Sequence, residues 1–234
     1  LRTWAWIERP KRGLDGVLDV IEQLQGMPLL ASALERDILP ARVRNFHSGM
    51  FDELFQSGEI LWQGIEPVGQ QDGRIAIYLA DQYPLLARGV ADQSLGETAI
   101  RIVALLETRG ALTFDEMAVA LTVPPSDLVA PLWDAVWAGR ISNDALTALR
   151  STLKLNTGGG ADSARISGVR RRGRAGRFRS RRRQFIPGTE GRWYALPDPA
   201  AQTSATQHVE ALARQLLERN AVVTREAVAA EGIP

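Results

Sequence analysis

The sequence contains no cysteine among its 234 residues, which excludes disulfide bonds and metal sites built on thiolates. Only two histidines are present, His47 and His208, and neither has a second potential ligand at a spacing typical of metal sites. We therefore expect no metal site and interpret both histidines as surface residues. With so few histidines, no Ser-His-Asp arrangement for hydrolysis can be assigned either.

Motifs of nucleotide chemistry and of membrane insertion are also missing. The pattern GxxxxGK does not occur, and the glycines at 158–160 lie in a polar stretch rather than between a strand and a helix. No run of about 18 uncharged apolar residues exists, and the apolar part of the N-terminal stretch is too short for a signal peptide. We expect a soluble, cytoplasmic protein with no bound cofactor and no membrane partner.

Positive charge is concentrated in one part of the chain, the arginine segment Arg165–Arg183, with ten arginines in nineteen residues and no carboxylate. The rest of the chain holds 18 of the 28 basic residues and all 27 acidic ones, an excess of nine negative charges. Such a segment buries too little apolar surface to fold alone, so we expect it to be mobile until a partner binds it. Phosphate backbones match clustered arginine best, and a solvated loop is the alternative. The arginines predicted to contact phosphate are Arg170, Arg171, Arg172, Arg174, Arg177, Arg179, Arg181, Arg182 and Arg183.

The first part of the chain predicts three helices followed by a β-hairpin. Helices are expected from Leu14 to a stop at Gly26, from Pro28 to Pro40, and from Ser48 to a stop at Gly58. The stretches 60–64 and 74–79 alternate apolar and polar residues as strands do, and Asp72–Gly73 has the chemistry of a hairpin turn. This order is typical of a winged helix, a helix-turn-helix with an appended β-ribbon.

The same order recurs further along the chain. Ser94 with Glu97, and Thr113 with Glu116, form capping-box patterns for two helices. A third helix is expected over 126–138, with Trp133 and Trp137 as core residues, and strands over 140–144 and 191–196. The residues from 199 predict two helices of a further unit, at Val209–Leu217 and after Thr224, without its third helix and wing. These last 30 residues should dock on the second unit or be poorly ordered.

The sequence thus predicts a mainly α fold with small β-hairpins, arranged as tandem winged-helix modules. The expected divisions are a lead-in at 1–13, a first unit at 14–82, a linker at 83–93, a second unit at 94–198 with a mobile arginine-rich insertion at 156–184, and an incomplete third unit at 199–234. The chain begins without methionine and ends inside a unit, so we expect it to be a segment of a longer protein.

Candidate contacts to nucleic acid precede the third helix of the first unit and lie on its wing. They are Arg42, Arg44, Asn45, His47 and Arg74. The third helices themselves carry acidic residues, Asp52 and Glu53 in the first unit and Asp127 and Asp134 in the second, which repel phosphate. We therefore interpret these helices as packing elements rather than base readers.

Several stretches together resemble the C-terminal region of the bacterial large helicase-related (Lhr) family. They are 20–43, 52–81, 132–150, 191–197 and 216–234. The resemblance implies a superfamily 2, ATP-dependent DNA repair helicase of 3′-to-5′ polarity, whose ATP and Mg²⁺ belong to a motor domain absent from this chain. It implies that the chain is an accessory DNA-binding and scaffolding region, non-catalytic by itself, whose partners are DNA, or alternatively RNA, and the helicase core of the same polypeptide.

Two alternatives remain open. Tails of this family resemble helix-turn-helix DNA glycosylases, and the spacing of Gln23 and Gln25 is similar to the paired glutamines of those enzymes, although the surrounding residues do not match. The chain would then form part of a uracil-excising domain. Alternatively, the acidic and apolar faces of the second unit would mediate assembly into a homo-oligomer.

Overall fold

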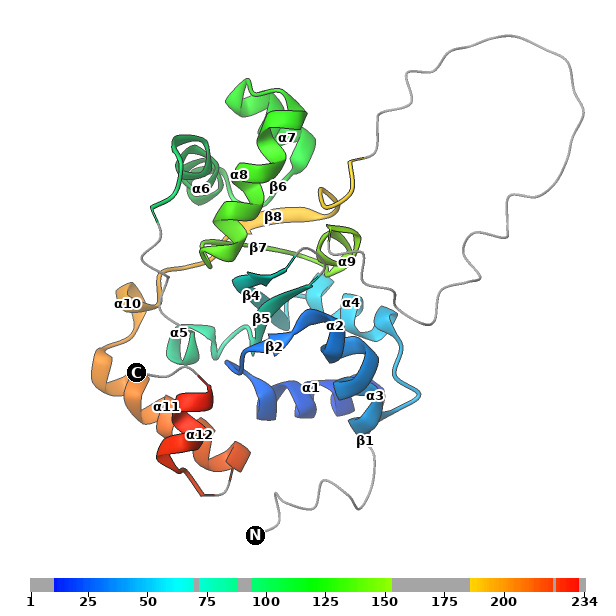
Figure 1. Cartoon of the computed structure of the whole chain (residues 1–234), viewed down its shortest axis with the longest axis vertical. Helices are drawn as coiled ribbons and strands as arrows, with labels where there is room; N and C mark the ends of the chain where they lie inside the picture. The colour runs from blue at the N-terminus through cyan, green and yellow to red at the C-terminus, as the bar shows by residue number, and fades with distance from the viewer. Residues whose placement is uncertain (1–10, 70–71, 88–93, 153–185, 221, 232–234) are drawn as a thin grey trace, which may run out of the picture.

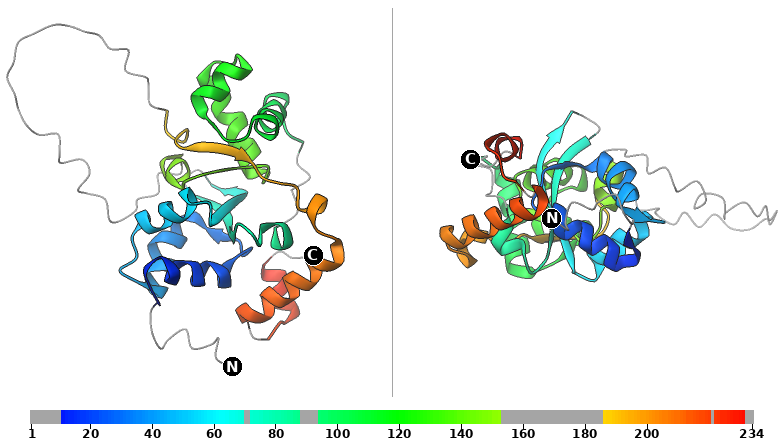
Figure 2. Two further views of the ribbon diagram at one scale, coloured as in Figure 1. Left: turned by 180° about the vertical axis from the view of Figure 1, so that it is seen from behind. Right: turned by 90° about the horizontal axis from the view of Figure 1, so that it is seen from below.

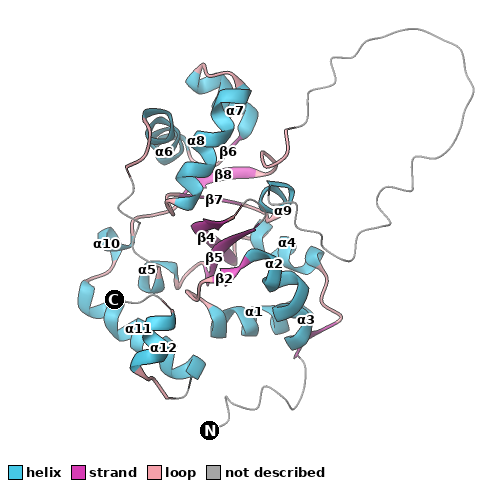
Figure 3. Cartoon of the chain, in the orientation of Figure 1, coloured by secondary structure: helices cyan, strands magenta, loops and turns pink. Residues whose placement is uncertain are grey.

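Short helices packed around small sheets make up the chain (Figures 1 and 3). The structure is a computed structural model that describes residues 11–69, 72–87, 94–152, 186–220 and 222–231. The arginine segment, and with it all nine arginines predicted to contact phosphate, lies outside the described residues.

The first unit and its lead-in form a parallel strand pair and a three-stranded antiparallel sheet. The elements are β1 (Lys11–Arg12), α1 (Gly13–Leu24), β2 (Leu29–Leu30), α2 (Ala31–Ala33), the π-helix η1 (Leu34–Ile38), α3 (Leu39–Arg42), β3 (Val43–Arg44), α4 (Ser48–Gln56), β4 (Ile60–Val68) and β5 (Asp72–Leu79). Strand β1 pairs with β3, and the larger sheet has the order β2-β5-β4. Gly26 and Gly58 follow α1 and α4 at φ +76° and +77°, a conformation that glycine adopts without strain, which confirms both predicted helix stops.

The predicted helix from Pro28 to Pro40 is wrong in its first and last turns. Leu29 and Leu30 are extended because they pair with Ile75 and Arg74 of β5, and a strand-paired dipeptide cannot join the helix. Pro40 does not end the helix, because α3 follows η1 without a break and continues to Arg42.

The hairpin is longer than the sequence pattern indicates. Strands β4 and β5 pair from Ile60↔Leu79 to Val68↔Asp72, so Asp72 and Gly73 belong to β5 and not to the turn. The Asp72 carboxylate instead accepts hydrogen bonds from Ser32, at 3.2 Å from the backbone N and 2.5 Å from Oγ. Asp72, which predicted a turn, thus ties the wing to α2.

The second unit repeats the order of a helix, a short strand, two further helical segments and two strands, but it has α9 (Thr147–Thr152) between its last two strands and no counterpart of β3. It consists of α6 (Glu97–Arg109), β6 (Leu112–Thr113), α7 (Phe114–Leu121), α8 (Pro125–Trp137), β7 (Ile141–Asn143), α9 and β8 (Arg192–Ala195). Its sheet order β6-β8-β7 corresponds strand for strand to β2-β5-β4. The Thr113–Glu116 capping box is confirmed. The Ser94–Glu97 box is wrong, because Gly96 occupies the N-cap of α6 without a side-chain cap.

The two units share a hydrophobic core. Trp133 is 6 % exposed and its ring packs edge-on against that of Trp193 at 5.7 Å, which confirms its predicted core role. Strand β4 of the first unit lies against β7 and α8 of the second. There Trp62 donates from Nε1 to the Asn143 carbonyl at 3.1 Å, and Ser142 donates from Oγ to the Trp62 carbonyl at 2.6 Å. These bonds satisfy polar groups that the interface buries.

The C-terminal segment consists of α10 (Pro199–Gln202), α11 (Ala205–Asn220) and α12 (Arg225–Ala230). Helix α11 packs on α1 and on the short helix α5 (Tyr83–Leu86), as Figure 2 shows from behind. The expectation that this segment is poorly ordered is therefore wrong, and docking on the second unit is only part of the contact: α11 packs mainly on α1 and α5, while Ala211 joins a cluster that includes Tyr194 and Leu196 of the second unit. Gln215 and Arg219 donate to the backbone carbonyls at the C-terminal end of α1, where positive and donor groups are favoured.

Candidate nucleic-acid interface

The parallel pair of β1 and β3 places two arginines side by side. Arg12 is the cross-strand partner of Arg44, and both are exposed. The neighbouring Lys11 is neutralised by Asp19, with Nζ and Oδ2 2.6 Å apart. Neither Arg12 nor Arg44 forms an ion pair with any residue that the structure describes. Because like charges directly opposite each other repel, a bound anion would stabilise this pair.

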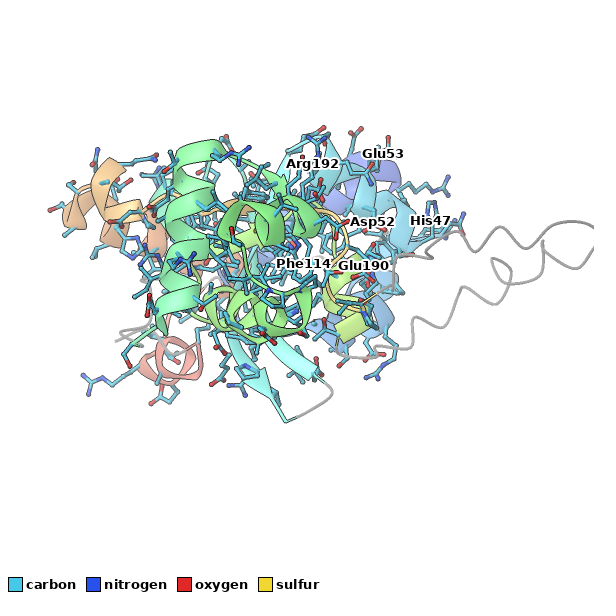
Figure 4. The ribbon with its side chains drawn as sticks, turned by 90° about the horizontal axis from the view of Figure 1, so that it is seen from above. His47, Asp52, Glu53, Phe114, Glu190 and Arg192 are labelled. Atoms are coloured by element: carbon cyan, nitrogen blue, oxygen red, sulfur yellow. The ribbon has the colours of Figure 1, made fainter. Side chains whose placement is uncertain are left out.

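The two arginines line a surface hollow of about 470 Å³, which we term the basic hollow. Its lining consists of Arg12, Gly13, Arg44, Asn45, His47 and Met50 and includes no carboxylate. Asn45 adopts φ +59°, a left-handed conformation that asparagine tolerates better than most residues, and so turns the chain from β3 towards α4. Figure 4 shows His47 at the outer edge of the molecule.

Two helices begin at the basic hollow. Helix α1 starts at Gly13 and α4 at Ser48, and their N-cap residues, Arg12 and His47, form no side-chain capping bond. The first turn of α4 holds no acidic residue, whereas that of α1 holds Asp15. Helix N-termini present backbone N–H groups and partial positive charge, which adds to the attraction of the arginines for an anion.

Three of the five candidates in the first unit therefore meet at one place, and two do not. Arg42 is half-buried and donates from Nη1 to the Ile38 carbonyl at 3.0 Å, and burial lowers the pKa of its guanidinium. Arg74 lies on the wing, where its Nη1 is 2.6 Å from Oε1 of Glu66 on the paired strand. Its charge is thus partly neutralised within the protein.

The third helix of each unit is engaged within the chain. In the first unit, Asp52 of α4 accepts a hydrogen bond of 2.9 Å from Arg150 of α9, and Arg150 also forms a bidentate pair with Glu35 at 2.6 and 2.7 Å. Burial alone would lower the pKa of Arg150, but hydrogen bonds to Glu35 and Asp52 outweigh it and raise the pKa. In the second unit, the C-terminal end of α8 packs on the wing of the first.

The glutamines of the glycosylase alternative lie at the end of α1. Gln25 is 4 % exposed; its Nε2 donates to Gln215 Oε1 at 3.1 Å, and its Oε1 accepts from the Leu79 N–H at 3.4 Å. The backbone carbonyl of Gln23 accepts hydrogen bonds from Gln215 and Arg219. Both residues thus help to dock α11. Among the described residues, no cluster of three or more histidine or acidic side chains could hold a metal ion.

Arg12 was not among the residues that the sequence predicted to contact nucleic acid, because the residues before α1 were assigned to a lead-in without a site. The only local sign was the basic pair Lys11–Arg12 directly before Gly13 and the helix. The partner that gives Arg12 its significance lies on β3, and a parallel pairing of two-residue strands leaves no periodic pattern.

Comparison with known proteins identifies the family of this chain. The family model described as the winged-helix domain of large helicase-related protein matches residues 1–80. A Lhr helicase and probable uracil glycosylase of Mycolicibacterium smegmatis is 36% identical over 227 residues, covering 95% of this chain. The chain belongs to the large helicase-related family. It is also 36% identical over 235 residues to the Lhr helicase/uracil glycosylase of Escherichia coli.

The family-model match shows that residues 1–80 form a winged-helix domain, and the chain aligns with the C-terminal part of these two relatives. The chain spans 15% of the length of each of these two relatives. No helix within the described ranges is both long and apolar enough to cross a bilayer.

Proposed function

We propose that this chain is an accessory region of an ATP-dependent DNA repair helicase, non-catalytic by itself, that binds the phosphate backbone of DNA. The observation that carries the proposal is the cross-strand pair of Arg12 and Arg44 in a hollow without a carboxylate. Arginine matches phosphate oxygens bidentately, and the uncapped start of α4 adds backbone donors. In this proposal the motor, with its ATP and Mg²⁺, belongs to another part of the polypeptide.

We also propose that the two units are tandem winged-helix modules that act as a scaffold. Their common order of elements and common sheet order support this. Their third helices are engaged in contacts within the chain, which argues against base reading in the major groove. DNA would instead be held through its backbone, independently of sequence.

The arginine segment would extend this contact. Its nine candidate arginines lie outside the described residues, and their charge and composition support phosphate binding. Neutralising them should weaken binding about equally for all DNA sequences and flatten its salt dependence.

The test is the affinity of the double variant Arg12→Ala/Arg44→Ala for labelled single-stranded and duplex DNA, measured by fluorescence anisotropy over a series of salt concentrations. Losing two phosphate contacts should weaken binding and reduce the slope of log K against log [salt] by about 1 to 2. RNA of the same sequence serves as a second ligand and reports whether the 2′-hydroxyl affects binding.

Arg36→Ala is the matched control, because Arg36 is an exposed arginine of the same unit that pairs with its neighbour Asp37 at 2.8 Å. This variant should bind DNA like the unaltered chain. If the double variant also binds with unchanged affinity and slope, the basic hollow is not a phosphate site.

A second candidate function is uracil excision, which the names of both relatives favour. The test is to incubate the chain with uracil-containing DNA and to assay for abasic sites. Product that disappears on changing Gln23 and Gln25 would establish this function. Circular dichroism and thermal unfolding must accompany the variants, because Gln25 also holds α11 to the first unit.

A further inference from the structure

A second pocket lies between helix α5, the second unit and the C-terminal segment. None of its lining residues belongs to the basic hollow. We term it the junction pocket. Helix α5, the end of α6, the residues after β8 and the start of α11 surround a volume of about 610 Å³. Pockets for small molecules usually measure roughly 300 to 1,000 Å³. Figure 1 shows α10 and α11 beside α5, and residues of this C-terminal segment, among them Pro199, Ala205 and His208, line one side of the pocket.

Rigid apolar groups form much of the wall. Pro84, Leu196, Pro197 and Pro199 line the pocket, and three of them are proline rings. Proline loses little conformational freedom when a ligand packs on it, and its ring presents a broad apolar face. A flat, rigid ligand would bury apolar surface here at low entropic cost.

The polar groups of the junction pocket carry both signs of charge. Arg140 and Glu107 line it, with Nη2 and Oε1 3.5 Å apart and side chains 40% and 54% exposed. Asp198 is a second carboxylate in the lining. This balance disfavours a phosphate group, in contrast to the basic hollow, and favours a neutral ligand with donors and acceptors on its edge.

His208 supplies a fixed acceptor. Its Nδ1 lies 2.8 Å from the Leu85 carbonyl oxygen, which can only accept, so Nδ1 carries the proton. In the neutral ring Nε2 is then an acceptor, and it forms no hydrogen bond with any described residue. The bond to Leu85 fixes the tautomer and the ring orientation together.

We propose that the junction pocket binds a nucleobase, presented by a nucleotide that is unpaired or extruded from a duplex. A nucleobase is flat and neutral and has donors and acceptors along one edge, which is the combination that the walls, His208 and the Arg140–Glu107 pair fit. The inference rests on the proposed function, because DNA binding would bring the base to the pocket. It adds a site for the base, on residues other than Gln23 and Gln25, to the phosphate contacts proposed above.

The chain has only two histidines, and they report on the two sites separately. We would record the imidazole ¹⁵N signals while titrating uridine, thymidine, cytidine and adenosine, and then inorganic phosphate. Nucleosides should shift the Nε2 signal of His208 saturably and leave His47 unchanged. Phosphate should shift His47 and leave His208 unchanged. A response of His47 without one of His208 would overturn the nucleobase site while sparing the phosphate site, and the reverse would overturn only the phosphate site.

Three variants sharpen the test. His208→Asn keeps a donor for the Leu85 carbonyl and removes Nε2, so it should bind nucleosides about tenfold more weakly, as the loss of one hydrogen bond predicts, with an unchanged melting temperature. Ala205→Phe should fill the pocket and abolish nucleoside binding, because Ala205 lines it from the first turn of α11. Arg44→Ala should bind nucleosides normally. Unchanged affinity in both His208→Asn and Ala205→Phe would overturn the proposal, as would the absence of any His208 response to all four nucleosides.

Discussion

Single side chains fix several turns of this protein, and Glu116 shows how one carboxylate does so. It accepts hydrogen bonds of 2.8 Å from the backbone N and from Oγ of Thr113, which close the start of α7. Both bonds favour the ionised form and lower the pKa of Glu116, the backbone bond most. A group whose pKa is lowered by folding stabilises the protein above its unfolded pKa, and this stabilisation is lost as the pH falls through the folded value.

Replacing Glu116 with glutamine should therefore lower the melting temperature at pH 7 and have little effect at pH 3. Glutamine retains an acceptor for Thr113 but has no charge, so the difference should shrink as the pH falls below the ordinary carboxyl value of 4.5. Thermal unfolding followed by circular dichroism over this range measures it. Thr113→Ala is the comparison, because it removes the bond that the Glu116 N–H donates to the threonine hydroxyl, at a cost of about 1 kcal/mol at every pH, and in addition the hydroxyl's bond to the carboxylate, so its effect should shrink only in part as the pH falls. A constant difference between pH 7 and pH 3 for Glu116→Gln would contradict the argument.

The capping box could be predicted from the sequence because all of its partners lie within one turn. So could the stops at Gly110 and Gly139, which adopt φ +76° and +70°. The pairing of Arg12 with Arg44 could not, because it joins two separate elements. Arg42 and Arg74 looked equivalent to Arg44 in sequence, and only their contacts with Ile38 and Glu66 distinguish them.

Among the elements, α11 depends most on a few polar contacts. Its buried residues are Gln215 and Leu216, so little apolar surface holds it. Arg219 compensates by donating to the carbonyls of Gln23 and Gln25 and by pairing with Glu231, and the side chains of this pair are 7% and 9% exposed. Removing one partner of a buried pair leaves the other charge uncompensated.

Arg219→Ala should release α11 and α12 from the first unit at a cost of about 3 to 5 kcal/mol to their docking. Hydrogen exchange should show faster exchange in both helices and little change in β4 and β5. Arg214→Ala is the matched control on the same helix, because Arg214 is 71% exposed and pairs only with Glu210 one turn away. Unchanged protection of α11 in Arg219→Ala would show that Arg219 is not needed to hold the helix.

The periodic helices were predictable, whereas the shortest elements were not. Strands β2 and β6 are two residues each, too short to alternate visibly, and α9 follows β7 without a capping motif that the sequence reveals. The docking site of α11 was missed for a different reason. Gln215 and Arg219 bind backbone carbonyls of α1, and carbonyls leave no trace in the sequence.

At the scale of the whole molecule, the two units interlock through backbone that approaches too closely for side chains. A Cβ atom at Gly64 of β4 would collide with the Val136 carbonyl of α8, and one at Gly73 with the ring of Trp137. The wing of the first unit thus rests directly on the third helix of the second. The hydrogen bonds of Trp62 and Ser142 lie along the same boundary, as does the bond that Arg150 donates to Asp52.

Gly64→Ala should separate the units locally and destabilise the chain by about 1 to 3 kcal/mol, the usual cost of overpacking. Calorimetry should show one unfolding transition for the unaltered chain and a broadened or divided transition for the variant. Gly96→Ser is the control, because a Cβ atom there meets nothing within 4 Å and serine is favoured at the N-cap position that Gly96 occupies. If both variants melt alike, the contact between β4 and α8 contributes nothing to coupling.

This interlock has a mechanical consequence. With Gly64 seated on the Val136 carbonyl and Gly73 on the ring of Trp137, little free space remains at this contact in which one unit could rotate on the other. Force applied to a DNA strand bound at Arg12 and Arg44 would be transmitted through the close-packed contact to the second unit. It would not be absorbed by bending between the units. The two units would therefore behave as one rigid body with a fixed relative orientation. Any flexibility between bound DNA and the rest of the polypeptide would have to lie outside this contact.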